Sequence, residues 1–229
     1  MTETIENLFI YIATYIPLLS IIIFLVFYTR IKNILLFKVV FFYSIIELLT
    51  NIISLYASYK TIYQVYSFFT AAEYGLFAYG LFTTLKKASF KKVVIALSIG
   101  FAFFWFSYKF FSKRGFVGLD SIPIGVETIL ILAFAFCYLY EQMDSTSQTL
   151  IYNQYHFWIT TGIMLYLAGS FFIYIFLNNV DQKTAAIYWM FTNIFTCIKH
   201  ILFAISIFVY LKGAKKKSTN KNYYLYTAN

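Results

Sequence analysis

The sequence predicts an all-α polytopic membrane protein, a bundle of seven transmembrane helices with the N-terminus outside and the C-terminus in the cytoplasm. Three observations lead to this prediction. Of the 229 residues, 61% are hydrophobic and only 12% are charged, whereas soluble domains carry roughly 25% charged residues. Apolar runs that reach the roughly 20 residues needed to cross a bilayer occur seven times. The positive charges gather in alternate loops, as the positive-inside rule requires.

The seven apolar segments account for nearly the whole chain and are joined by short connections. They lie near residues 7–28, 34–57, 62–85, 92–111, 121–141, 155–177 and 184–211, and a basic cytoplasmic tail occupies 212–229. The first segment follows Glu3 and Glu6, lacks a basic leader and is too long for a signal peptide, so we expect a retained helix. No connection is long enough for a folded soluble domain, so any recognition or catalysis is expected in the bundle, its loops or the tail.

The orientation follows from the positive side chains. With the N-terminus outside, twelve of them fall on the inner side and five on the outer side, which favours N-out and C-in. The net charge of +9 is then explained by topology and by contact with lipid headgroups, and we expect no nucleic-acid partner. The inner set is Arg30, Lys32, Lys38, Lys86, Lys87, Lys91, Lys92, Lys212, Lys215, Lys216, Lys217 and Lys221, and the outer set is Lys60, Lys109, Lys113, Arg114 and Lys183.

Three segments carry polar stripes at helical spacing, and such stripes face the bundle interior because lipid cannot satisfy polar groups. The second segment has Tyr43, Glu47, Asn51, Ser54 and Ser58, the third has Tyr66, Thr70, Glu73, Gly80 and Thr84, and the seventh has Thr192, Asn193, Thr196, Lys199 and His200. The fourth segment has few polar residues and is expected to be the most exposed to lipid. In the sixth, small residues at Gly162, Gly169 and Ser170 predict close helix packing.

The candidate site is centred on Lys199, because a lysine at the bilayer centre costs roughly 2.5 to 3.5 kcal/mol and needs a partner or water. Glu47 and Glu73 lie at similar depth and are its candidate partners; which of them pairs with Lys199 stays open. We expect one glutamate to be protonated or a cation to bind there. Asn51, Asn193, Thr196 and His200 complete the candidate ligand or ion site. The alternative is a buried ion pair that only fixes helix packing.

Two further ionisable residues have open roles. Because His200 follows Lys199 directly, their side chains diverge by about 100 degrees on a helix, and we expect them to point at different targets. A lone intramembrane histidine is more often a hydrogen-bonded packing residue than a metal ligand. Glu127 lies six residues inside the fifth segment, where it either guards an outer vestibule or snorkels to the surface.

Enzymes and cofactors are not indicated. Asp120, Asp144 and Asp181 fall in predicted loops, so the intramembrane aspartate pair of presenilin-like proteases is missing. With two histidines, His156 and His200, the chain lacks the three that ceramidase-like hydrolases use for zinc. Cys137 and Cys197 lack metal-ligand spacing and are expected to be core residues. We therefore expect no catalytic residues, no metal site and no cofactor.

The plan of seven helices, an outside N-terminus, Lys199 in the seventh helix and Glu73 in the third resembles a rhodopsin. That resemblance implies retinal bound to Lys199 as a Schiff base, with Glu73 as its counter-ion. Phe195 stands four residues before the lysine, where microbial rhodopsins usually carry an acidic residue. In the overall character of the sequence, the run from Phe157 to Phe172 and the seventh segment also resemble small seven-helix membrane proteins of Bacteroidetes-type bacteria. That resemblance implies no activity.

The leading functional hypothesis is a multi-pass sensor or signalling subunit of a bacterial inner membrane. A ligand or proton would act on the polar site, and the basic inner loop and tail would contact a cytosolic signalling partner. The first alternative is a small proton- or cation-coupled transporter or channel that uses the same residues. A retinal-binding protein, a structural membrane subunit and a homo-oligomer also stay open.

Overall fold

The structure is a computed structural model that describes residues 2–111, 121–144, 150–176 and 182–226. Every element in these ranges is a helix, which confirms the predicted all-α class for the described part of the chain. The elements are α1 (Thr2–Tyr15), α2 (Pro17–Val26), α3 (Tyr28–Ile31), α4 (Leu35–Tyr56), α5 (Tyr59–Thr84), α6 (Ala88–Phe111), α7 (Ser121–Asp144), η1 (Ile151–Asn153), α8 (Tyr155–Phe176) and α9 (Gln182–Tyr226).

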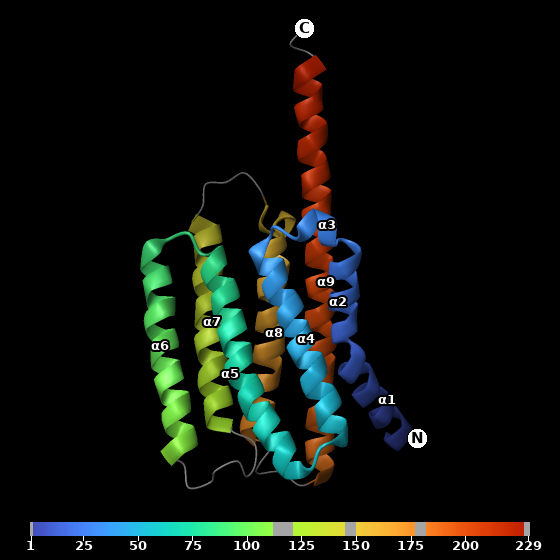
Figure 1. The fold of residues 1–229 in the computed structure, drawn as a ribbon, viewed down its shortest axis with the longest axis vertical. Helices are drawn as coiled ribbons and strands as arrows, with labels where there is room; N and C mark the ends of the chain where they lie inside the picture. Colours follow the sequence, from blue (N-terminus) through green and yellow to red (C-terminus); the bar gives the residue numbers. More distant parts are fainter. Residues whose placement is uncertain (1, 112–120, 145–149, 177–181, 227–229) are drawn as a thin grey trace.

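The first predicted segment is divided into α1 and α2 by Pro17. The proline nitrogen has no hydrogen to donate to the carbonyl of Ala13, so the helical hydrogen-bond pattern is interrupted there. The N–H of Leu19 instead bonds the carbonyl of Ile16 at 2.9 Å. As a result α1 leaves the bundle at an angle to α2 (Figure 1).

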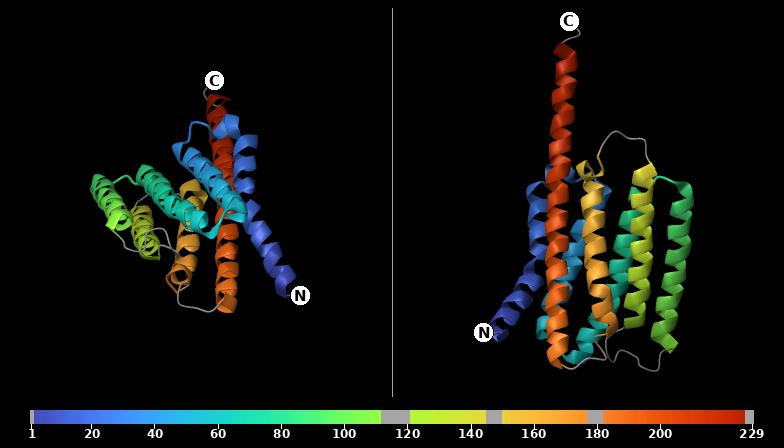
Figure 2. Two further views of the ribbon diagram at one scale, coloured as in Figure 1. Left: turned by 60° about the horizontal axis from the view of Figure 1, so that its bottom comes forward. Right: turned by 180° about the vertical axis from the view of Figure 1, so that it is seen from behind.

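The helices form a closed ring. The α1/α2 pair contacts α4 and α9, and the ring continues from α4 to α5, α7, α8 and back to α9. Helix α6 packs outside this ring against α5 and α7, at the edge of the bundle (Figure 2). Among the helices that could span a membrane, α6 buries the smallest share of its residues, as expected for the most lipid-exposed helix.

Five helical stretches of the described residues are long and apolar enough to cross a membrane: Leu8–Val26, which covers parts of both α1 and α2, Leu35–Tyr56, Ala88–Phe111, Ser121–Asp144 and Ile187–Lys215. Helix α5 runs beside them (Figure 1). It is less apolar than α4 and carries the buried polar residues Thr70 and Glu73. Large apolar side chains cover the outside; Phe103 is 72% exposed and Val26 is 68% exposed. A surface of this kind is stable in lipid and not in water, so the chain associates with a membrane.

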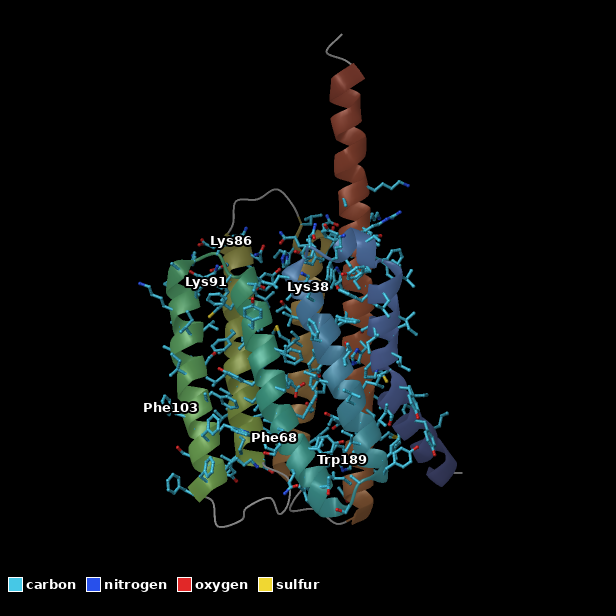
Figure 3. All side chains as sticks on the ribbon, viewed as in Figure 1. Lys38, Phe68, Lys86, Lys91, Phe103 and Trp189 are labelled. Carbon is cyan, nitrogen blue, oxygen red and sulfur yellow. The ribbon has the colours of Figure 1, made fainter. Side chains whose placement is uncertain are left out.

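Three lysines mark one end of the bundle. Lys38, Lys86 and Lys91 lie at the end where α9 leaves the bundle, whereas Trp189 lies toward the other end (Figure 3). We call these the basic end and the N-terminal end. Helix α9 continues past the basic end to Tyr226. Lys113 and Arg114, which were predicted for the opposite side, lie outside the described residues.

At the basic end, the buried carboxylate of Glu141 connects α7 to the loop that precedes α6. Its two oxygens accept hydrogen bonds from the backbone N–H groups of Lys86 and Lys87, each at 2.7 Å. The Lys87 ammonium donates to Asp144 at 2.6 Å, and this carboxylate raises the pKa of Lys87. Helices α5, α6 and α7 are thereby joined at one point.

Candidate polar site in the helix bundle

Lys199 is completely buried on α9, and in the described part of the chain its ammonium contacts Glu47, Tyr43 and Tyr166. Its Nζ donates hydrogen bonds to Oε1 of Glu47 at 2.9 Å and to the hydroxyl of Tyr43 at 2.5 Å. The ring centroid of Tyr166 lies 3.7 Å from the same nitrogen, which adds a cation-π contact. The question left open by the sequence is therefore resolved: Glu47 is the direct partner of Lys199.

His200 contacts the same glutamate, so the prediction that Lys199 and His200 point at different targets was wrong. The His200 Nε2 lies 2.8 Å from Oε2 of Glu47, and its Nδ1 lies 2.9 Å from the hydroxyl of Ser20 on α2. The carboxylate has two oxygens and the lysine side chain is long and flexible. Two groups that diverge on α9 can therefore reach opposite sides of one acceptor.

The network continues from Lys199 to the second glutamate through Tyr43. The Tyr43 hydroxyl donates to Oε1 of Glu73 on α5 at 2.7 Å while it accepts the bond from Lys199. Hydrogen bonds therefore run without a break from α2 through α9 and α4 to α5. The six members in order are Ser20, His200, Glu47, Lys199, Tyr43 and Glu73, and we call them the polar chain.

Sequence reasoning missed two members of the polar chain. Tyr43 stands four residues before Glu47, so its position on the same face of α4 was visible in the stripe and indicated a contact. Ser20 is an isolated hydroxyl in the apolar run of the first segment, and no periodicity pointed to it. Both side chains are buried in the structure, at 0% and 2% exposure.

A cavity of about 470 Å³ adjoins the polar chain in the half of the bundle toward the N-terminal end. Its wall includes six of the residues that the sequence proposed for the site and the vestibule: Glu47, Asn51, Glu73, Glu127, Asn193 and Thr196. Lys199 and His200 are not among the described residues that line the cavity; they lie behind Glu47 and bond it from α9. All eight predicted residues thus meet in one region, as two connected parts.

Glu127 is 1% exposed, so the alternative that it snorkels to the surface is wrong. It lines the cavity from α7, and Glu73 lines the same cavity from α5. Within the described part of the chain, its Oε1 has no hydrogen-bond partner. The reason for the error is that the cavity, and not the bundle surface, receives the side chain.

Close packing between α8 and α9 positions the lysine. A Cβ atom on Gly162 would lie 3.3 Å from the backbone oxygen of Lys199, and one on Gly169 would overlap the ring of Phe195. The predicted close contact of these small residues is confirmed. Because the two helices approach so closely, the ring of Tyr166 on α8 comes to lie over the ammonium on α9.

The arrangement does not fit the retinal role that the rhodopsin resemblance implies. The Lys199 nitrogen is held by Glu47 and Tyr43, outside the cavity wall formed by the described residues, and Glu73 meets it through the Tyr43 hydroxyl. What the residues do support is the exchange of protons or cations: two carboxylates, Glu73 and Glu127, face a cavity without a cationic side chain bonded directly to either among the described residues.

The chain was compared with known proteins at three levels. It matches no protein-family model, and neither a curated protein nor a solved structure was found that matches it.

Proposed function

We propose that this protein is a multi-pass sensor of a bacterial inner membrane, with seven crossings, the N-terminus outside and the C-terminus in the cytoplasm. A proton or ligand acts at the cavity on Glu47, Glu73 and Lys199, and the change alters the packing of α9 against α4 and α5. A cytosolic partner reads the change at the basic end.

The observation that carries the proposal is the unbroken polar chain, which joins α2, α9, α4 and α5 through buried groups. Burying charges is costly, and well-packed apolar residues are often at least as stabilising as a buried ion pair. A network of six polar residues between helices is therefore better explained by use than by stability alone. A proton gained or lost at Glu73 acts first on Tyr43 and through it on Lys199, because the Tyr43 hydroxyl bonds Glu73 and Lys199 at once.

Helix α9 is the natural output of such a sensor. It carries Lys199 and His200 and continues to Tyr226, so its 45 residues extend over about 68 Å as one helix. A small tilt near Lys199 is therefore enlarged at the far end. The lysines of the tail and of the loop at Lys86 and Lys87 would offer a partner a basic surface.

The test is a distance measurement between spin labels on α6 and α9. Ser89 is exposed at the start of α6, and a side chain at Gly213 on α9 meets nothing within 4 Å, so both accept a labelled cysteine. The native Cys137 and Cys197 are replaced by alanine. In lipid nanodiscs, from about pH 5 to about pH 8, the range in which carboxylic acids in such sites and histidines exchange protons, we expect the distance to change.

The same pair of labels in the Lys199→Met variant provides the control, because the polar chain is then interrupted. We expect that variant to give one distance at every pH. The sensor hypothesis would be contradicted if the distance between the labels in the wild-type protein were constant over the whole pH range, both without and with an added small organic cation.

A second candidate function is a small proton- or cation-coupled transporter. The break at Pro17 favours it, because α1 contributes Ile10, Ala13 and Thr14 to the cavity wall and diverges from the bundle at that residue. Movement of α1 about this point would open the cavity. Uptake of a cation into reconstituted vesicles, driven by a pH gradient and lost in Glu73→Gln, would identify a transporter; no uptake with a retained change in spin-label distance favours the sensor.

A further inference from the structure

We infer that the cavity binds a small organic cation, a primary ammonium on an apolar body, with the ammonium held by Glu73 and Glu127. This inference rests on the proposed function and deepens it, since it names the class of ligand for the same cavity.

The first argument is the incomplete environment of Glu127. This carboxyl group is 1% exposed and its Oε1 has no partner in the described ranges, although a buried polar atom without a hydrogen bond is costly. The side chain lines the cavity, so the missing partner has to come from the cavity. In its ionised form the carboxyl group only accepts hydrogen bonds, and a partner that holds it in that form is therefore a donor.

The second argument is the distribution of charge. Glu47 is compensated by the ammonium of Lys199 and also has a hydrogen bond to the imidazole of His200. Among the described residues, Glu73 accepts hydrogen bonds from the neutral hydroxyls of Tyr43 and Tyr166, and Glu73 and Glu127 repel each other when both are ionised. The cavity thus combines two poorly compensated carboxylates in a medium of low dielectric constant. It favours a positively charged donor over a neutral one.

The third argument concerns size and wall chemistry, which separate an organic cation from a metal ion. A bound Ca²⁺ or Mg²⁺ is surrounded by six or more oxygen atoms at about 2.0 to 2.6 Å, and no group of three acidic, histidine or cysteine residues in the described ranges is suitably placed. The cavity of about 470 Å³ is far larger than one ion and falls in the range of small-molecule sites.

The wall is suited to an apolar body. Besides the acidic groups it presents large apolar and aromatic side chains, those of Leu55, Ile62, Tyr66, Phe69 and Trp189. Aromatic rings attract cations through their faces, and this bundle already uses that contact where the ring of Tyr166 covers the ammonium of Lys199 at 3.7 Å. A ligand with an ammonium at one end and a ring or short alkyl chain at the other matches both the acidic and the apolar residues of the wall.

The experiment compares 2-phenylethylamine with 2-phenylethanol, which has nearly the same shape but no positive charge. Binding of each is measured by calorimetry to wild-type protein in detergent, in a sodium-free buffer and again with added sodium chloride. We expect the amine to bind and the alcohol to bind at least about tenfold more weakly, because the alcohol cannot compensate the carboxylates. Equal binding of both compounds, or no binding of either, would overturn the inference. Full displacement of the amine by sodium would also overturn it, because the cavity would then be a site for a tightly bound sodium ion.

The variants place the amine in the cavity. Glu127→Gln is expected to weaken amine binding about tenfold or more, because the ammonium loses an ionic partner, while the variant folds, since the amide is easier to bury. Asp144→Asn is the matched control: it makes the same chemical change on the same helix, about 25 Å farther along, and amine binding should be unchanged. Glu73→Gln serves as a second variant if Glu127→Gln does not fold. Unaltered amine binding in both cavity variants would overturn the inference.

The result is distinguishable from failure of the sensor proposal. A spin-label distance that changes with pH in protein that binds no amine would leave the sensor proposal standing and remove this inference. Amine binding that leaves the spin-label distance constant would support this inference and contradict the sensor proposal.

Discussion

Replacement of Lys199 by methionine removes the ammonium group that donates hydrogen bonds to Glu47 and to the Tyr43 hydroxyl, with little change in side-chain volume. In the structure, the Glu47 carboxylate then keeps His200 as its donor at 2.8 Å and loses the ammonium at 2.9 Å. Removing one partner of a buried ion pair costs about 3 to 5 kcal/mol, because the other charge is left buried. We expect a loss of this size for Lys199→Met, and a similar loss for Glu47→Gln.

The double variant Glu47→Gln/Lys199→Met removes both charges together. It should cost at least about 2 kcal/mol less than the sum of the two single variants, because neither charge is left without its partner. Reversible unfolding in detergent gives the four free energies of this cycle. Asp144→Asn, which alters an exposed ion pair with Lys87, is the control and should unfold like the wild type.

Additive losses in the cycle would refute this reasoning, because Lys199 and Glu47 would then not interact in the folded protein. Single losses below about 1 kcal/mol would also refute it, since they are typical of exposed pairs.

Three further predictions concern packing and hydrogen bonding in the bundle. Gly169→Ala should destabilise the protein by about 1 to 3 kcal/mol, because the added methyl group meets the Phe195 ring. Gly100→Ala, where the Cβ meets nothing within 4 Å, should be neutral or stabilising. Thermal unfolding of the two variants compares them directly. Ser20→Ala removes the partner of Nδ1 of His200 and should cost about 1 to 3 kcal/mol in the same assay, while Ser20→Thr, which keeps the hydroxyl, should cost less. Glu141→Ala leaves two backbone N–H groups unpaired and should increase hydrogen exchange at the start of α6; unchanged exchange there would contradict the role given to this carboxylate.

Much of the fold follows from the sequence because lipid imposes simple rules. A segment predicted at 34–57 is the helix Leu35–Tyr56, and one predicted at 155–177 is the helix Tyr155–Phe176. Apolar length specifies such helices, since backbone groups in lipid must be satisfied within the segment. The sequence is less informative where a single residue changes the backbone hydrogen bonding. Pro17 was noted, yet its division of the first segment depends on the lost hydrogen bond and not on hydropathy.

The candidate site was predictable as a set of residues but not as a set of contacts. Spacing placed Glu47, Glu73 and Lys199 on inward faces at similar depth, and the structure brings them together. Spacing cannot give the rotation of one helix relative to another or the path of a long side chain. That is why the shared contact of Lys199 and His200 with one carboxylate, and the burial of Glu127, differ from expectation.

The most direct measurement of the central claim uses Tyr43→Phe, which deletes the hydroxyl that links Glu73 to Lys199 and keeps the buried ring. With spin labels at Ser89→Cys and Gly213→Cys, the distance is measured in wild type and in this variant across pH, and with 2-phenylethylamine. The account predicts that the distance changes in wild type and stays constant in Tyr43→Phe, although the variant still folds and binds the amine. An equal change in both proteins would contradict the claim that the polar chain carries the signal from the cavity to α9.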